Sequence, residues 1–205
     1  SESDIAVIVN PNNPDGLRYQ PDDLFKLAEQ VELLIIDEAF ADGSPELSVV
    51  PKMENSNILV LRSIGKFFGL AGLRLGFVIG PADITGALAE SLGPWAVSGP
   101  AIEIGSRALS DQAWISAMHE TLNAQSTRLN KLLTTHGLTI FGGTELFTLV
   151  ELDTAQSLYN AFGNAGILVR RFEDQSNWLR IGLPGAEIEW HRFESVLNAI
   201  NNVGE

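Results

Sequence analysis

The sequence contains no cysteine, which excludes a disulfide framework and a thiolate metal site. Its histidines, His119, His136 and His191, lie far apart and match no spacing typical of metal ligands, so we expect no metal site. There is also no apolar run long enough to span a bilayer and no charged-then-apolar signal segment. We therefore expect a soluble, cytoplasmic protein.

Basic residues are scarce, since 13 Lys and Arg oppose 26 Asp and Glu and the formal net charge is -13. This charge repels nucleic-acid phosphates and anionic lipid, so we expect neither nucleic acid nor a membrane as a partner. An anionic ligand must instead be bound by a local group of cations, because the field of the whole chain opposes it. Each arginine and lysine is therefore a candidate binding residue.

The 205 residues are 45% hydrophobic and 19% charged, which is enough apolar material for one domain, or one domain and a small lobe. The chain opens on Ser1–Asp4 and passes at once into the apolar run Ile5–Val9, which is typical of an interior strand. Because a domain rarely opens on a central strand, we expect further sequence before residue 1.

The first 80 residues contain four short apolar runs, and their apolar residues are near-continuous rather than alternating. This pattern predicts strands that are buried on both faces of a parallel sheet. A helical pattern with proline and acidic residues at its start lies between the first two runs. Strand, helix and strand in this order predict an α/β fold. The expected strands are 5–9, 33–36, 58–61 and 77–79, and the expected helix is 21–30.

The remainder of the chain changes pattern. Residues 84–135 are helical in periodicity, and the longest helix is expected from Asp111 to a stop at His136–Gly137, where glycine can cap it. We predict two domains, with residues 1–118 in a larger domain and residues 119–205 in a smaller α+β domain. The smaller domain is expected to contain strands at 146–152, 167–172 and 178–183 and helices at 155–164 and 187–201.

Three polar clusters follow the first three predicted strands: Asn10–Gly16, Asp37–Phe40 and Arg62–Lys66. In open parallel sheets, ligands bind just beyond the carboxyl ends of the strands. Each cluster alone has an ordinary structural explanation, such as a turn for Asn-Pro-Asp-Gly or a helix N-cap for Asp-Glu. The glycine-rich segment 69–76 is neither a dinucleotide-binding fingerprint nor a P-loop.

The combination is more specific than its parts. The order Asn-Pro-x-Gly, Asp-x-Ala-aromatic and Ser-x-x-Lys, followed by Arg74 eight residues after Lys66, resembles the fold-type I enzymes that use pyridoxal 5'-phosphate (PLP). This is the aspartate aminotransferase superfamily, and the resemblance covers Asn10 to the last predicted helix. It implies a PLP-dependent transferase-like large-domain sheet, truncated at its N-terminus, with a smaller C-terminal α+β domain. It also implies a homodimer.

The resemblance assigns a role to each polar residue. Lys66 is implied as the Schiff-base lysine, which binds PLP covalently and later moves protons. Asp37 would keep the ring nitrogen protonated, because a nearby anion raises its pKa. Asn13 would donate to the 3-oxygen of the ring, and Ser63 and Arg74 would bind the cofactor phosphate.

Two positions depart from the commonest pattern of the superfamily. Many members have a tyrosine where this chain has Phe40, which has no hydroxyl to donate to the ring oxygen. Many also have Ser or Thr directly before the lysine, where this chain has Gly65. Both departures indicate a subgroup that differs from a typical transaminase.

The strings N-P-N-N-P-x-G and G-L-A-G-L-R-x-G are typical of the histidinol-phosphate aminotransferase branch. Within it, segments 37–42, 62–70 and 94–98 are most similar to the threonine-phosphate decarboxylases of cobalamin biosynthesis. This resemblance implies decarboxylation of L-threonine O-3-phosphate to aminopropanol phosphate. A histidinol-phosphate type aminotransferase and a catalytically inactive PLP-fold fragment are alternatives.

Two arginines match positions at which relatives bind anionic substrate groups. These are Arg180, in Trp-Leu-Arg-Ile-Gly, and Arg170, in Val-Arg-Arg-Phe. On a chain of net charge -13, two arginines on neighbouring strands suit an amino-acid phosphate with two anionic ends. For Arg171 we prefer surface salt bridging. Relatives also have an N-terminal region that contacts the cofactor, so we predict that these 205 residues alone bind PLP weakly or not at all.

Overall fold

The computed structural model describes residues 3–201 and divides the chain into two compact units. The first unit comprises Ser1–Asn13 and Leu17–Ala117, and the second comprises Pro14–Gly16 and Met118–Glu205. The division falls inside the predicted long helix, which is observed as α4, Gln112–Thr135. Gly137, which follows it, has a φ of +77°, the left-handed conformation expected at a helix C-terminus.

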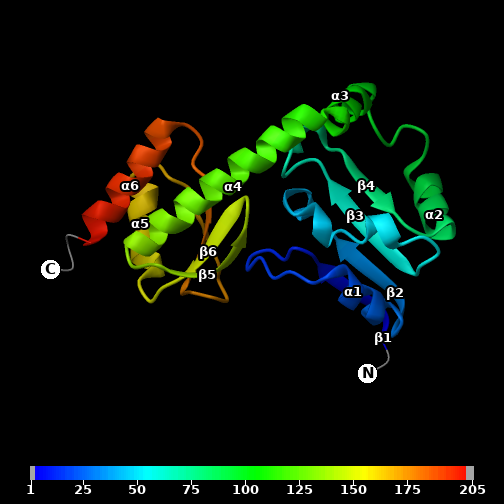
Figure 1. Cartoon of the computed structure of the whole chain (residues 1–205), viewed down its shortest axis with the longest axis horizontal. Helices are drawn as coiled ribbons and strands as arrows, with labels where there is room; N and C mark the ends of the chain where they lie inside the picture. Colours follow the sequence, from blue (N-terminus) through cyan, green and yellow to red (C-terminus); the bar gives the residue numbers. More distant parts are fainter. Residues whose placement is uncertain (1–2, 202–205) are drawn as a thin grey trace. The chain divides into compact units, whose positions relative to one another are not determined.

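A four-stranded sheet in the order β1-β2-β3-β4 forms the centre of the first unit (Figure 1). β1, β2 and β3 are parallel, and Val9, Asp37 and Leu61 lie level across them as Cα partners. The carboxyl ends of these strands therefore meet at one edge, as the sequence predicts. The elements are β1 (Ser3–Val9), α1 (Pro21–Ala28), β2 (Val31–Asp37), β3 (Ile58–Ser63), β4 (Gly76–Ile79), α2 (Ala82–Leu92) and α3 (Gly99–Ser110).

One face of this sheet carries the core of the unit. Leu34 and Ile36 of β2, with Ile58 and Val60 of β3, are fully buried against Leu24 of α1. Because successive strand residues point to opposite faces, residues 33, 35 and 37 lie on the other face. Burying each of these apolar side chains contributes about 1.5–3 kcal/mol to the free energy of folding. This burial stabilises the part of the sheet from which the strand ends project.

The prediction that all four strands are parallel and buried on both faces is wrong. β4 is antiparallel to β3, because the chain turns straight back between Ser63 and Gly76 without a crossover helix. All residues of β4 are exposed, and in the other edge strand Ile5 and Val7 are 56% and 65% exposed. These strands lie at the two edges of the sheet, so fewer neighbours cover them.

The second unit contains an antiparallel sheet in the order β5-β6-β8-β7. The predicted helices at 155–164 and 187–201 are confirmed as α5 and α6. β5 was not predicted, because Gly142 and Gly143 interrupt its apolar pattern. The strand expected at 167–172 is shorter than predicted, since Val169 packs into the core just before it. The elements are β5 (Thr139–Thr144), β6 (Phe147–Glu151), α5 (Ala155–Asn164), β7 (Arg170–Arg171), β8 (Trp178–Gly182) and α6 (Glu187–Asn201).

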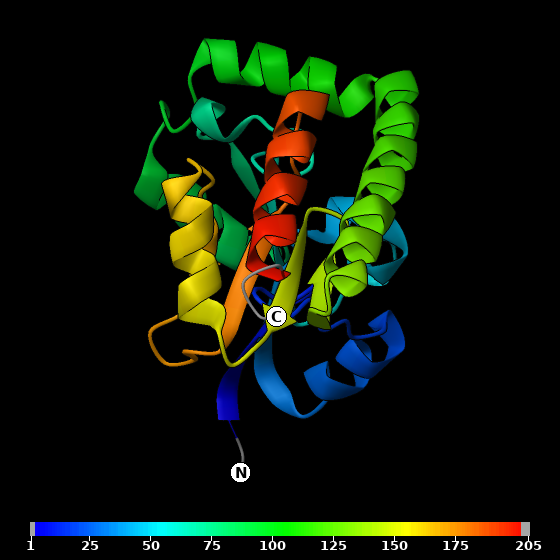
Figure 2. The ribbon, with the colours of Figure 1, turned by 90° about the vertical axis from the view of Figure 1, so that its left-hand side faces the viewer.

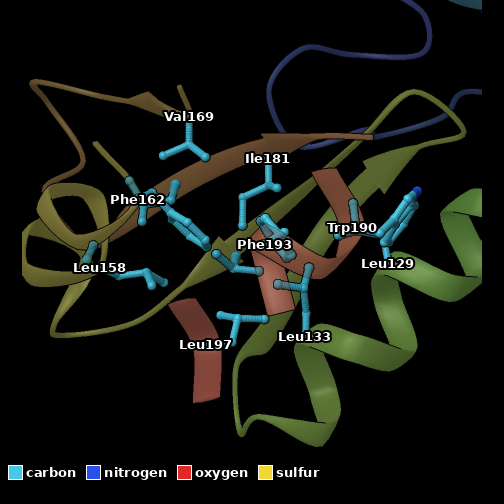
Figure 3. Close-up of a cluster of buried hydrophobic side chains, with 12 residues drawn as sticks. Leu129, Leu133, Leu158, Phe162, Val169, Ile181, Trp190, Phe193 and Leu197 are labelled. Carbon is cyan, nitrogen blue, oxygen red and sulfur yellow. The ribbon is translucent and has the colours of Figure 1, made fainter. Parts of the chain in front are cut away.

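The helices α4, α5 and α6 cover one face of this second sheet (Figure 2). The close-up in Figure 3 shows their side chains converging on the sheet. Leu129 of α4, Phe162 of α5 and Phe193 of α6 are buried with Ile181 of β8. The rings of Phe162 and Phe193 stack with centroids 4.8 Å apart. Since Leu179 and Ile181 face this core, Arg180 between them lies on the opposite face of the sheet.

The tip of the first turn, Pro14–Gly16, packs against β5 within the second unit. Gly16 has a φ of +70°, and a Cβ placed on it would lie 2.0 Å from the carbonyl oxygen of Gly143. A Cβ on Gly142 would lie equally close to the carbonyl oxygen of Asp15, at 2.0 Å. Two backbones thus approach within a distance that only glycine allows, which is the physical reason for the glycines in the turn and in β5.

An ion pair joins α4 to the start of α6. Arg128 donates to both carboxylate oxygens of Glu187, at 2.5 and 2.9 Å, and its guanidinium lies 4.2 Å from the centroid of the Trp190 ring. The hydrogen bonds from Arg128 lower the pKa of Glu187 below its usual value. The position of Glu187 in the first turn of a helix also favours its negative form.

This ion pair predicts a pH-dependent contribution to stability. A carboxylate whose pKa is lowered by folding stabilises the protein above the pKa of the unfolded chain. That stability is lost as the pH falls through the folded pKa of Glu187. We expect wild type to melt at a higher temperature than Glu187→Gln at pH 7, and the difference to vanish in acid. Melting temperatures between pH 7 and pH 3 test this, and a difference that is independent of pH would contradict it.

Candidate functional site

The edge at which β1, β2 and β3 end carries the predicted cofactor residues of the first unit. Main-chain hydrogen bonds continue just past the strands, from Asn10 to the Asp37 carbonyl and from Glu38 to the Leu61 carbonyl, both at 2.9 Å. Strand alternation places Asp37 and Ser63 on the sheet face opposite α1, and Glu38 and Arg62 on the same face as α1. The same edge therefore presents two different polar groups, one on each face.

Asp37 ends β2 and is half-buried. One of its carboxylate oxygens accepts a hydrogen bond from the main-chain N–H of Ala39, at 2.9 Å, which fixes its side chain. The loop that follows is anchored by Ala41, which is fully buried and donates to the Glu38 carbonyl at 3.0 Å. The turn after β2 thus orients Asp37 through one carboxylate oxygen, and the hydrogen bond from Ala39 does not involve the second oxygen.

The Asn10–Gly16 cluster forms a turn, as expected. Asn10 is fully buried, and its amide group both accepts from the Tyr19 N–H and donates to the Tyr19 carbonyl. The main-chain N–H of Asn12 donates to the Leu17 carbonyl at 2.8 Å and closes the turn. Asn13 lies within it and is exposed. Asn10 therefore fixes the segment, and Asn13 is presented by it.

Lys66 lies in the turn directly after β3 and is exposed. Its neighbours Ile64 and Phe67 are buried, at 2% and 4% exposure, and anchor the turn on either side of it. The hydroxyl of Ser63 accepts from the N–H of Gly65 at 3.1 Å, and the Lys66 carbonyl accepts from Gly69 at 3.1 Å. Two buried anchors and these local hydrogen bonds hold the lysine outward from the sheet edge.

Antiparallel pairing of β3 and β4 closes a loop that contains both Lys66 and Arg74. Ser63 and Gly76 are Cα partners, so the segment between them is a closed loop that contains Lys66 and Arg74. Arg74 adopts a left-handed conformation with φ 53°, which is uncommon for a residue other than glycine. Its guanidinium donates to the Ala71 carbonyl at 3.1 Å and is exposed. The loop returns Arg74 to the end of β3 that carries Ser63.

A buried network that the sequence analysis missed supports this edge. Glu38 is fully buried and accepts from the Ser48 hydroxyl at 2.6 Å and the Val49 N–H at 2.9 Å. Arg62 donates to Glu38 at 3.0 Å and also forms an ion pair with Asp42. The sequence does contain a signal for this network: acidic residues at 37, 38 and 42 follow one strand, and Arg62 ends the next one. Such charged residues are more often solvated at the surface, so the signal is easily missed.

In the second unit, the two predicted substrate-binding arginines are direct cross-strand neighbours. Arg170 of β7 and Arg180 of β8 are Cα partners in the antiparallel pair. Arg180 lies over the Phe147 ring, 5.0 Å from its centroid, and Arg170 lies over the Phe172 ring at 5.2 Å. Burial, and then the charge of Arg170, lower the pKa of Arg180. Like charges directly opposite one another destabilise a sheet, and an anion bound by both would relieve the repulsion.

Arg171, the residue after Arg170, contacts side chains of α5. It donates to the Gln156 side chain at 3.3 Å, and its guanidinium lies 5.4 Å from the centroid of the Tyr159 ring. It therefore contacts a neighbouring helix rather than the Arg170–Arg180 pair. We expected a carboxylate as the partner of Arg171, and the hydrogen-bond partner observed is instead the neutral amide of Gln156.

Within residues 3–201, no cluster of three or more carboxylate or histidine side chains could hold a metal ion. No helix in that range combines the length and the apolar character that a membrane crossing requires.

Comparison with known sequences gives matches along most of the chain. A sequence model described as aminotransferase class I and II matches residues 1–197. The chain is 40% identical over 198 residues to a threonine-phosphate decarboxylase of Pseudomonas aeruginosa, covering 95% of this chain and 60% of the relative. It is 43% identical over 188 residues to a threonine-phosphate decarboxylase of Sinorhizobium sp., covering 89% of this chain and 56% of the relative. The chain thus spans less than two thirds of either relative.

Solved structures have a similar fold. The histidinol-phosphate aminotransferase of Clostridium acetobutylicum is 26% identical, with a TM-score of 0.87 over 97% of this chain and 64% of the other. The histidinol-phosphate aminotransferase of Sinorhizobium meliloti, solved in complex with pyridoxal-5'-phosphate, is 19% identical, with a TM-score of 0.85 over 98% of this chain and 58% of the other. The latter similarity shows the fold alone.

Proposed function

The chain belongs to the aminotransferase class I and II family, and from this we propose that it is part of a PLP-dependent enzyme that decarboxylates L-threonine O-3-phosphate. The products would be CO2 and aminopropanol phosphate, in cobalamin biosynthesis. The observation that carries the proposal is the placement of Asp37, Ser63, Lys66 and Arg74 at one end of the first sheet. The identity of 40% and 43% to two threonine-phosphate decarboxylases supports the choice of reaction.

The donor set at this edge fits PLP. A half-buried carboxylate, Asp37, suits the protonated ring nitrogen, and the exposed amide of Asn13 suits the 3-oxygen. Ser63 and Arg74 offer a hydroxyl and a guanidinium to the phosphate, and Lys66 offers a primary amine. On this basis residues 1–118 are proposed as part of the cofactor-binding large domain, and residues 119–205 as the small domain.

Bound PLP supplies an electron sink for the bond that breaks at the substrate Cα. Asp37 would hold a proton on the ring nitrogen, which makes that sink effective. Lys66 would give a proton to Cα after CO2 has left. The Arg170–Arg180 pair would bind the anionic groups of the substrate and so decide which bond at Cα is presented for cleavage.

An aminotransferase of histidinol-phosphate type is the second candidate. The specific observation in its favour is the 26% identical histidinol-phosphate aminotransferase structure, with a TM-score of 0.87. The same cofactor residues and the same arginine pair would serve it, since that substrate also carries a phosphate. A catalytically inactive PLP-fold fragment is the third candidate.

An assay of the full-length protein separates these candidates. With L-threonine O-3-phosphate and PLP but no keto acid, we expect CO2 and aminopropanol phosphate to be released in equal amounts. Transfer of the amino group to a keto acid, without CO2 release, would establish the aminotransferase instead. Neither product would indicate an inactive protein. Separately, these 205 residues alone are expected to bind PLP weakly or not at all, which absorbance titration tests.

Replacing Arg180 tests the proposed substrate site. We expect Arg180→Met in the full-length protein to lower kcat/KM for L-threonine O-3-phosphate about 10–100-fold, because hydrogen bonds to charged groups contribute about 1.5–3 kcal/mol each. Most of the effect should fall on KM. The matched control is Arg171→Met. Arg171 lies on the same strand as Arg170, and its own side chain contacts Gln156 and Tyr159. Equal losses in both variants would contradict a specific role for Arg180.

We also propose, from the family resemblance, that the protein is a homodimer and that it acts in the cytoplasm. The first unit exposes large apolar side chains that a second subunit could bury, and among them Trp95 and Leu92 are 92% and 68% exposed. Sedimentation of the full-length protein would distinguish a dimer from a monomer.

A further inference from the structure

We propose that Arg62 is a positioning residue that holds the ring of Phe40 against the amino group of Lys66. The proposal rests on the proposed function, because it concerns the lysine of that site. Its structural basis lies within the first unit, where one guanidinium binds the carboxylates on both sides of Phe40.

The position of Phe40 is set by its sequence neighbours. Glu38, two residues before it, is fully buried, and Ala41, directly after it, is also fully buried. Asp42, two residues after it, has a side chain that is only 15% exposed. Phe40 is therefore the outward part of a short arch whose two sides are fixed inside the unit.

Arg62 joins the two sides of this arch to β3. Nη1 of the guanidinium donates to Glu38 at 3.0 Å, and Nη2 pairs with Asp42. A planar guanidinium presents its donors in a fixed fork, so it sets the spacing of the two carboxylates as well as their charge. Arg62 is also the residue before Ser63 and lies four positions before Lys66. The arch and the lysine turn are consequently fixed to one strand.

The result of this arrangement is a contact between ring and amine. Lys66 Nζ lies 5.4 Å from the centroid of the Phe40 ring, within the range of a cation–π interaction. A phenylalanine ring attracts an ammonium group through its face, but it has no hydroxyl with which to donate or accept a hydrogen bond. Phe40 can therefore hold the amino group of Lys66 through the face of its ring alone.

Nuclear magnetic resonance of the cofactor-free full-length protein, with lysine labelled at 13Cε, tests the contact directly. The lysines of the 205-residue sequence are Lys26, Lys52, Lys66 and Lys131, and a Lys66→Arg variant assigns the signal. We expect the Hε signal of Lys66 to be displaced upfield by the ring current of Phe40. Phe40→Leu should abolish the displacement, and Phe40→Tyr, which retains the ring, should preserve it.

The role of Arg62 is tested through Asp42, because Asp42→Asn weakens one side of the arch and leaves the Arg62–Glu38 pair in place. We expect the upfield displacement of Lys66 to decrease in Asp42→Asn and to be unchanged in the control Asp83→Asn, whose residue is exposed on α2. An unchanged Lys66 signal in Phe40→Leu would overturn the ring contact. An unchanged signal in a folded Asp42→Asn would overturn the positioning by Arg62.

These outcomes are independent of the reaction. The signal is recorded without PLP or substrate, so failure of the decarboxylation assay leaves the result intact. Conversely, if the protein decarboxylates the substrate but Phe40→Leu leaves the Lys66 signal unchanged, the proposed function stands and only the Phe40–Lys66 contact is wrong.

Discussion

Replacing Lys66 by alanine is expected to lower kcat/KM for CO2 release from L-threonine O-3-phosphate by about 10⁴-fold or more in the full-length protein. The turn after β3 holds this lysine outward between the buried anchors Ile64 and Phe67. Alanine removes the amine while leaving both anchors in place. Covalent attachment of PLP, scored by borohydride reduction and peptide mapping, should be lost together with activity.

The matched control for this prediction is Lys52→Ala. Lys52 is an exposed lysine of the same unit, at the end of the short 3-10 helix Val50–Lys52. Its removal changes the net charge by the same amount but should leave activity and PLP attachment within about twofold of wild type. Retention of covalent PLP in Lys66→Ala, or its loss in Lys52→Ala, would contradict the assignment of Lys66.

Replacing Arg62 by methionine is expected to destabilise the protein by about 3–5 kcal/mol. The reason is that Glu38 is fully buried and would lose the cation that compensates its charge. Its hydrogen bonds from Ser48 and Val49 remain, but neither donor carries a charge. Urea unfolding of the full-length protein, followed by circular dichroism, measures the difference in free energy.

The control is Arg107→Met, which removes an arginine–carboxylate pair of similar geometry on the surface. Arg107 and Glu103 of α3 have side chains that are 80% and 65% exposed, so their pair is expected to contribute only about 0–1 kcal/mol. A loss of stability in Arg62→Met no larger than in Arg107→Met would show that the buried network does not stabilise this edge.

Local features of the sequence predicted most of the helices and the first three strands. The apolar runs 5–9, 33–36 and 58–61 lie within β1, β2 and β3, and the helical patterns at 155–164 and 187–201 match α5 and α6. These signals are local because a helix is specified by periodicity and capping, and a buried strand by a continuous apolar run. Nothing distant in the chain is needed to interpret them.

Pairing between distant strands was harder to predict. The direction of β4 follows from the return loop between Ser63 and Gly76, and β5 depends on a bulge and two glycines that hide its pattern. Glu38 and Arg62 could not be identified as a buried pair from their charges alone, since most such residues are solvated. Each of these features depends on which segment of the chain pairs with or packs against it in the folded protein. A one-residue change in strand register would move the side chains concerned to the other face of the sheet.

By itself, the sequence determined the family, the order of most of the elements and the residues proposed for cofactor and substrate, because these depend on residue types at fixed spacings. Only the tertiary structure decided that Arg170 and Arg180 are directly opposed, that Arg62 binds the two carboxylates around Phe40, and that the Phe40 ring lies beside Lys66. The physical reason is that these contacts act over a few ångströms in space, and strand pairing together with the loops that follow the strands sets those distances between residues far apart in the chain.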